Sequence, residues 1–149
     1  MVNPCTIRDL LPLAYMCLDR MSEDQAILWV RTKLYDMFDK FFIFDPTAAL
    51  YYESFGRNKY CIHLVGSTKD IKGYKNFVKD TGYWIFEHTN CTSLIALSSV
   101  SNKRLQRFIS LTGATRSGTI LGSGENMENE IVYSYPKSRY LEEGINYGI

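Results

Sequence analysis

Several features that would each point to a particular class of protein are scarce or missing in this sequence. None of its apolar runs approaches the roughly 20 residues that a helix needs to cross a membrane. The stretch from Met1 to Asp9 lacks the basic start, apolar run and small-residue cleavage site of a signal peptide. The cysteines show no paired spacing of the kind that holds zinc or exchanges disulfides; they are Cys5, Cys17, Cys61 and Cys91. We therefore expect reduced thiols in or near the core, no membrane span and no secretion through a signal peptide.

An excess of charge of one sign is missing as well, and histidine is rare. The net charge is only +1, so no global field draws the chain to nucleic acid or to an acidic membrane. The two histidines, His63 and His88, titrate near neutral pH, which leaves catalysis open to them. We interpret both as structural, because His63 lies in an alternating strand pattern and His88 near a helix end. Without a suitably spaced third ligand they predict no zinc site, and Cys91 close to His88 is weak support for a catalytic pair.

The composition that is present is that of a globular protein with one core. The 149 residues are 46% apolar and 22% charged, and the aromatic share of 14% includes eleven tyrosines. A chain of this length buries enough surface to form one cooperative domain. We predict a single domain over residues 1–136, followed by a C-terminal tail over 137–149.

Hydrophobic periodicity predicts an alternation of helices and strands. The expected helices cover about 9–21, 23–39, 70–89 and 103–112, and the expected strands cover about 48–55, 59–65, 92–100, 114–121 and 130–135. This order predicts an α/β (α+β) protein with a mixed central sheet flanked by about four helices. Right-handed crossovers through the third and fourth helices would place the strands they join side by side.

Local signals support several of these boundaries. Ser22 and Gln25 have the form of a capping box, and Gly56 to Asn58 suits a hairpin. The helix over 70–89 is clearly amphipathic, although Gly82 allows a break. Its predicted inner face consists of Ile71, Tyr74, Val78, Thr81, Ile85 and His88.

One part of the pattern resembles a known family. From Leu94 to Gly118 a buried strand leads to an asparagine-led helix at Asn102, then to Gly113 and a final strand pair. This order is similar to the second half of GNAT acyltransferases, and with the preceding strand and helix the resemblance covers residues 59–135. It implies a GNAT-like fold.

The same region departs from that family at two places. A GNAT enzyme cradles the pyrophosphate of acetyl-CoA on exposed amides at a glycine-rich helix start. Here the matching stretch is Val65 to Gly73, its glycines are far apart and Asp70 repels phosphate. Phe108 and Ile109 stand where the family often has a proton-donating tyrosine. We therefore expect no cofactor; if acetyl-CoA does bind, the resemblance implies contacts from Gly66, Ser67, Thr68, Lys69 and Asn102.

A GNAT-like scaffold without its phosphate loop resembles small virion-associated or head-assembly proteins of short-tailed bacteriophages. Our first hypothesis is therefore a non-enzymatic assembly protein, present in the host cytoplasm or the virion, that binds other virion proteins or its own copies. The aromatic C-terminal stretch supplies its predicted partner-binding residues, because tyrosine is favoured in interfaces. These are Tyr133, Tyr135, Tyr140, Leu141, Tyr147 and Ile149.

Two alternatives remain. The first is an active GNAT-type N-acyltransferase that uses acetyl-CoA. The second is a nucleic-acid-binding module whose two basic helices contact phosphates, with an affinity that falls as salt is added. Its predicted phosphate contacts are Lys72, Lys75, Lys79, Lys103, Arg104 and Arg107.

Overall fold

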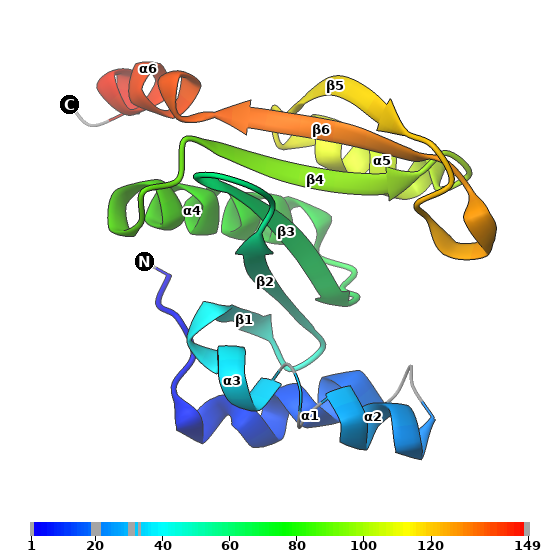
Figure 1. Ribbon diagram of the computed structural model, residues 1–149. Helices are drawn as coiled ribbons and strands as arrows, with labels where there is room; N and C mark the ends of the chain where they lie inside the picture. Colours follow the sequence, from blue (N-terminus) through cyan, green and yellow to red (C-terminus); the bar gives the residue numbers. More distant parts are fainter. Residues whose placement is uncertain (1, 19–21, 30–31, 33, 148–149) are drawn as a thin grey trace.

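The strands of the protein form one mixed sheet. The structure is a computed structural model, and it describes residues 2–147 except 19–21, 30, 31 and 33. In the described residues the strand order is β1-β2-β3-β4-β6-β5 (Figure 1). The bounds are β1 Phe41–Asp45, β2 Ala48–Ser54, β3 Lys59–Gly66, β4 Ser93–Ser99, β5 Thr115–Ile120 and β6 Glu130–Pro136. Neighbouring strands run antiparallel except β3 and β4, which are parallel.

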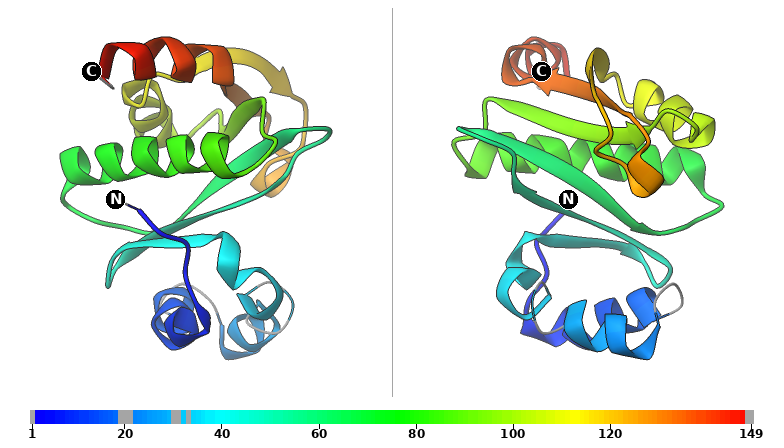
Figure 2. Two further views of the ribbon diagram at one scale, coloured as in Figure 1. Left: turned by 90° about the vertical axis from the view of Figure 1, so that its left-hand side faces the viewer. Right: turned by 45° about the vertical axis from the view of Figure 1, so that its right-hand side comes forward.

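Helices lie on both faces of this sheet. The longer ones are α1 Leu10–Leu18, α2 Glu23–Trp29, α4 Ile71–His88, α5 Lys103–Leu111 and α6 Lys137–Tyr147. Short turns precede and connect them: η1 Ile7–Asp9, α3 Tyr35–Met37, η3 Phe38–Lys40 and η4 Glu125–Met127. The α1/α2 pair lies beyond β1, far from α4 and α6 (Figures 1 and 2). No helix within the described ranges is long and apolar enough to span a membrane.

Strand alternation explains why two separate core clusters form. Successive side chains of a strand point to opposite faces. From β2, Leu50 and Tyr52 enter the cluster beneath α4, whereas Ala49 and Tyr51 enter the cluster beneath α1. A third cluster, around Ile109 of α5, packs on β6. The sheet is therefore covered by α1 and α2 at one end and by α4 and α5 on the other face.

Helix α4 is fixed to the sheet by a close contact at Gly82. The helix runs through this glycine without a break, and a Cβ added there would lie 3.0 Å from Cδ1 of Leu94. The inner face differs from the expected one at both ends. Ile71 is 41% exposed and His88 is exposed as well. The buried positions are Tyr74, Phe77, Thr81, Gly82, Ile85 and Phe86, because the helix meets the sheet through a face rotated toward Phe77 and Phe86.

Several local predictions are confirmed. The backbone N–H of Gln25 donates to Oγ of Ser22 over 3.3 Å, and the N–H of Ser22 donates back to Oε1 of Gln25 over 3.2 Å. Asn102 caps α5 by accepting from the Leu105 N–H at 3.1 Å. Gly113, with φ of 92°, follows the end of that helix in the left-handed region that suits glycine. The turn between β2 and β3 contains Gly56 and Asn58, both with positive φ.

Other predictions need correction. The second helix does not run to residue 39 as one piece, because α2 ends at Trp29 and a separate short α3 follows. The aromatic run from Phe41 forms β1, a strand missed because it lacks alternation. The strands that flank α5 are not neighbours, since β6 lies between β4 and β5. Finally, residues 137–147 of the expected tail form α6; whether residues 1–136 make one domain without it stays a prediction.

Candidate functional site

The two parallel strands at the centre of the sheet pair only at their beginnings. The paired residues are Lys59 with Ser93, Tyr60 with Leu94, and Cys61 with Ile95. Beyond these pairs β3 continues along β2 to Gly66, while β4 continues along β6 to Ser99. The second halves of β3 and β4 therefore separate, and an opening is left in the middle of the sheet.

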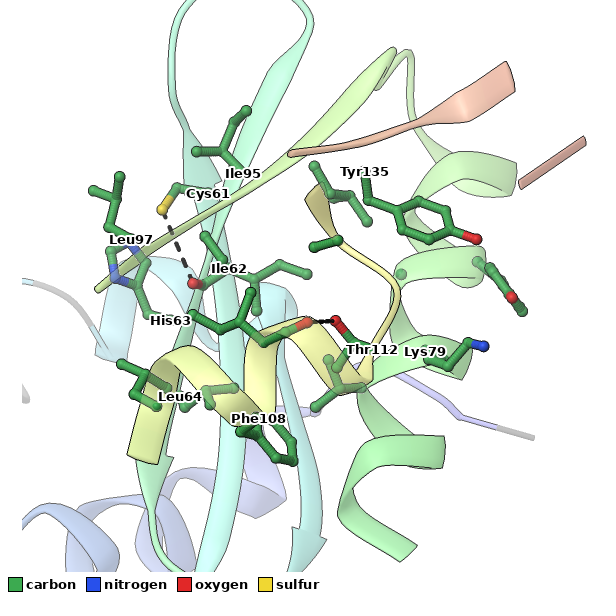
Figure 3. A pocket seen from close by; sticks show the side chains of 18 of the residues that line it. Cys61, Ile62, His63, Leu64, Lys79, Ile95, Leu97, Phe108, Thr112 and Tyr135 are labelled. Carbon is green, nitrogen blue, oxygen red and sulfur yellow. Dashed lines mark hydrogen bonds between the residues drawn. The ribbon is translucent and has the colours of Figure 1, made fainter. Parts of the chain in front are cut away.

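A pocket of about 310 Å³ fills this opening. Its walls include the consecutive residues 61–64 of β3 and 94–97 of β4, and consecutive strand residues point to opposite faces. The pocket therefore runs through the sheet instead of lying on one face. The remaining wall is mostly apolar and comes from α4, α5 and β6, with Val78, Phe86, Phe108 and Tyr135 among its members (Figure 3). Such a mostly apolar pocket suits the apolar part of a small ligand.

The polar groups at the α4 side of the pocket are tied to α6. Tyr83 and Tyr135 line the pocket, and both hydroxyls donate to Oε2 of Glu143, that of Tyr83 over 2.7 Å. Burial alone would raise the pKa of Glu143, but these two hydroxyls and the nearby charges of Lys79 and Arg139 outweigh it and lower the pKa. Burial, followed by the bond to Glu143, raises the pKa of Tyr135 to about 12. The two phenols therefore stay neutral and hold α6 against the pocket.

On the opposite face of the sheet, the pocket wall includes a histidine with an acidic neighbour. Nε2 of His63 lies 2.7 Å from Oε1 of Glu53, and each side chain is about one-third exposed, at 33% and 34%. The imidazole also stacks on Tyr51, with the ring centroids 4.7 Å apart. The sequence left a catalytic role of His63 open, although we interpreted the residue as structural, and it did not point to Glu53. The register of the β2–β3 hairpin was the available signal, since it places Glu53 opposite Cys61 and diagonal to His63.

The first turn of α4 does not fit a pyrophosphate. The Asp70 carboxylate accepts from the Gly73 N–H at 3.0 Å, so a carboxylate already occupies the position where this helix start would bind an anion. Adding a Cβ at Gly73 would bring it within 2.3 Å of that carboxylate. The Asp70 carboxylate therefore occupies a backbone N–H that a phosphate oxygen would need, in addition to the predicted repulsion by its charge.

The loop before α4 is also bonded within the protein. The N–H of Ser67 donates to the Thr47 carbonyl at 3.0 Å, and the Thr68 hydroxyl donates to Asp45 at 3.3 Å. Gly66 has φ of 75°, and a Cβ there would lie 1.9 Å from the Thr47 carbonyl oxygen. Lys69 is exposed. Of the residues proposed for acetyl-CoA, these four lie together, whereas Asn102 caps α5 elsewhere and lies outside the pocket lining.

At the position of the family's tyrosine, Phe108 lines the pocket and Ile109 is buried. Neither side chain can donate a proton. The basic residues are distributed over two helices, Lys72, Lys75 and Lys79 on α4 and Lys103, Arg104 and Arg107 on α5. Lys79 belongs to the pocket wall, and binding of nucleic acid by the whole set stays a prediction.

The aromatic residues proposed for partner binding lie in different environments. Tyr133 and Tyr135 are only 6% and 8% exposed, because β6 directs them into the core beneath α5 and α4. Tyr140 stacks on Phe86 and donates its hydroxyl to Glu87. Leu141 is 53% exposed. The side chain of Tyr147 and all of Ile149 lie outside the described residues, so partner binding by this end stays a prediction.

Neither metal ligation nor thiol chemistry stands out. Among the described residues no group of three or more histidine, cysteine or acidic side chains could hold a metal ion. Cys5, Cys61 and Cys91 are buried, as expected for thiols of the core, and Cys17 has no described side chain. Burial also raises the pKa of the Cys91 thiol. The opening between β3 and β4 is therefore the candidate site.

Comparison with known proteins gives a likeness in structure alone. No family model and no curated protein matches the sequence. A GNAT-family acetyltransferase from Bacillus anthracis is similar with a TM-score of 0.68 at 16% identity, over 92% of this chain and 94% of that one. A variant of spermidine N-acetyltransferase from Vibrio cholerae gives a TM-score of 0.73 at 10% identity, over 97% and 99%. A chain of the NatC complex, solved with a Gag peptide and CoA, gives 0.69 at 15%, over 91% and 97%.

These likenesses confirm the predicted GNAT-like mixed α/β fold and extend it over nearly the whole chain. They also correct our first hypothesis. The similar solved structures named above include a GNAT-family acetyltransferase and a spermidine N-acetyltransferase, and nothing in the comparisons relates the chain to a bacteriophage head or virion. The interpretation as a non-enzymatic assembly protein is therefore wrong, and the findings favour the acyltransferase alternative.

Proposed function

We propose that this protein is an N-acyltransferase that moves an acyl group from an acyl-CoA thioester to an amine. The observation that carries the proposal is the apolar pocket that passes through the sheet where β3 and β4 separate. Two reactants can enter such a passage from opposite faces and meet inside it. Fixing them together in this way replaces an encounter in solution by a reaction within one complex.

The two ends of an acyl-CoA fit this protein differently. The acyl group and the neighbouring arm fit the passage, where Ile62, Leu64 and Phe108 would contact them. The pyrophosphate does not fit the start of α4, because Asp70 fills it. We therefore assign no residue of that turn to the donor and place its binding in the passage. A bound acyl-CoA supplies the activated acyl carbon of a thioester.

The solved relatives in structure support the choice of an amine as acceptor. One is a spermidine N-acetyltransferase, and another belongs to the NatC complex, which was solved with a Gag peptide and CoA. For this chain we propose a primary amine of a small molecule or a peptide. The acidic Glu53 at the α1/α2 side of the passage suits a cationic acceptor.

Binding and transfer can both be measured on the whole chain. Calorimetry with acetyl-CoA is expected to show micromolar binding, and release of CoA thiol is expected to depend on added spermidine or peptide amine. Replacing Ala96, a pocket residue, by phenylalanine fills the passage and is expected to weaken binding by at least about tenfold. The control is Thr119→Phe, which adds the same ring on the exposed strand β5.

The stability of both variants is checked by thermal melting, because a larger side chain in a packed site costs about 1–3 kcal/mol. A variant that melts like the wild type and no longer binds acetyl-CoA supports the passage as the donor site. Absence of binding by the wild type to acetyl-CoA and to longer acyl-CoAs up to millimolar concentration would refute the proposed function.

A further inference from the structure

We propose that His63 is the catalytic base of the acyl transfer and that Glu53 is its positioning residue. This inference rests on the proposed function and assigns the proton transfer within it to two residues of this chain. It starts from the place of His63 in the fold. The side chain forms part of the wall of the passage from β3, on the face of the sheet that carries Cys61 and Val65 rather than the face that α4 covers (Figure 3).

His63 lies on the face of the sheet opposite α4, which is the face from which we expect the amine acceptor to enter. Beneath α4 and α5 the passage is mostly apolar and suits the acyl arm. On the other face, the neighbours of His63 include Glu53 and Tyr51 from β2. An amine that enters from this face passes a carboxylate and an imidazole before it reaches the separated strands. The two reactants thus approach from different faces, and the imidazole lies on the acceptor's face.

The imidazole ring is held in one orientation by stacked aromatic rings. Tyr51 lies between His63 and Phe41, and each neighbouring pair of centroids is 4.7 Å apart, with interplanar angles of 17° and 24°. Trp29 of α2 packs edge-on against Tyr51 at 6.3 Å. A base acts well only when its nitrogen is fixed within reach of the proton. The stack supplies that fixation from β1, β2 and α2.

Glu53 determines which nitrogen is used. Nε2 is shielded from solvent and lies 2.7 Å from Oε1 of Glu53, although the whole side chain is one-third exposed. The tautomer with its proton on Nε2 places that proton beside the carboxylate and leaves the lone pair on Nδ1. The carboxylate also stabilises the imidazolium that forms when Nδ1 takes a proton. A contact between an imidazole and a carboxylate this exposed adds little to folding stability.

The reaction balances with one proton held by His63. The amine nitrogen forms a bond to the thioester carbonyl carbon, and the carbon–sulfur bond breaks with its electron pair going to sulfur. The amine loses one proton to Nδ1 of His63, and the departing thiolate takes one proton from water or from the imidazolium. The products are an amide and a thiol, and no oxidant or reductant is needed. Because an alkyl amine is mostly protonated near neutral pH, the ammonium form first releases one proton to water, and His63 takes the further proton that the attacking neutral amine loses.

The test compares the two histidines of the chain. His63→Ala is expected to lower kcat by about 10²- to 10⁴-fold with KM for the amine changed little, the usual contribution of a general base. His88→Ala is the control, since His88 is exposed at the end of α4 and stacks on Trp84 outside the pocket lining. Added imidazole is expected to restore part of the rate of His63→Ala and to leave the wild type unchanged, which a merely structural histidine would not show.

Glu53 has its own comparison. Glu53→Gln keeps the shape and loses the charge, so kcat is expected to fall by roughly tenfold while acetyl-CoA binding by calorimetry stays at the wild-type value. Glu53→Asp is expected to recover part of the loss. If His63→Ala keeps the wild-type kcat while it binds acetyl-CoA, the assignment of the base is wrong and the acyltransferase proposal stands. If the wild type binds no acyl-CoA and acylates no amine, the proposed function is refuted, and the assignment of His63 as the base is refuted with it.

Discussion

At the scale of single residues, Asp70 is the main departure from an anion-binding helix start. Its carboxylate takes the Gly73 N–H that a phosphate oxygen would otherwise accept. The loop before it is bonded to Thr47 and Asp45, so its amides are partly used as well. Under the proposed function, the nucleotide end of the donor would therefore gain little from the start of α4.

The prediction at this scale concerns Asp70→Asn. Asparagine keeps an oxygen that caps Gly73, so stability is expected to change by less than about 1 kcal/mol. Removing the charge is expected to tighten binding of CoA and of inorganic pyrophosphate by roughly 3- to 30-fold, because a repulsive charge next to the helix N-terminus is lost. Calorimetry measures both ligands. Asp80→Asn, an exposed change on the same helix, is the control, and equal affinities of the two variants would contradict the prediction.

At the scale of elements, the contact of α6 with α4 and β6 depends on Glu143. Its carboxylate accepts from Tyr83 of α4 and from Tyr135 of β6. Tyr140 adds a ring contact with Phe86 and a bond to Glu87. The last helix is therefore part of the pocket's support, although aromatic content alone suggested a surface for partners.

The prediction for this contact is a pH-dependent difference between Glu143→Gln and the wild type. The folded-state pKa of Glu143 lies below its ordinary value of 4.5, so its stabilising effect is fully present above that value and is lost as the pH falls through the lowered folded pKa. Near pH 7 the variant is expected to be less stable by about 1 kcal/mol, a charged hydrogen bond discounted for partial exposure. The difference is expected to shrink toward about pH 3.

Urea unfolding at the two pH values measures this difference. Glu142→Gln serves as the control, because Glu142 is the exposed neighbour on the same helix. A stability gap of the same size at both pH values would show that the Glu143 carboxylate does not stabilise the fold through its charge.

At the scale of the whole molecule, the sheet consists of two parts joined at a short seam. One part is β1 to β3 and the other is β4 to β6, with the three β3–β4 pairs between them. Helix α4 packs across this seam, and its Phe77 and Phe86 belong to one core cluster with Leu50 of β2 and Leu94 of β4. The passage exists because the seam is short.

This arrangement predicts where a ligand protects the backbone. Acetyl-CoA bound in the passage is expected to slow amide hydrogen exchange in the separated segments, residues 62–66 of β3 and 96–99 of β4, because it suppresses their local opening. The exposed edge strand β5 is expected to exchange at its original rate. Hydrogen exchange read by mass spectrometry measures both, and uniform protection of the chain would contradict a site confined to the passage.

The sequence was sufficient for features that depend on neighbouring residues. The cap at Asn102, the helix end at Gly113 and the hairpin after Gly56 were predicted because each is fixed by local backbone chemistry. The placement of β6 between β4 and β5 was not, because pairing between distant strands is decided by the completed core. The strand at Phe41 was missed because a strand buried on both faces has no alternation to detect.

For the site, the residue types were visible in the sequence but their arrangement was not. His63 was a candidate base, yet its role depends on the separation of β3 from β4, which no local pattern encodes. Glu53 comes close to His63 only through the register of the β2–β3 hairpin, which the sequence alone does not give. Tyr83 and Glu143 are 60 positions apart and meet only after α6 has docked.

A passage that crosses the sheet also has a consequence for how selectivity can change. Under the proposed function, the wall contributed by α4 and α5 would contact the acyl donor, whereas the face that carries α1 and α2 would receive the amine. Substitutions in the first 40 residues can therefore alter which amine is accepted without disturbing the acyl chain length that fits. In this architecture, changes in α4 and α5 are expected to alter the preference for the acyl donor, and changes in α1 and α2 the preference for the amine.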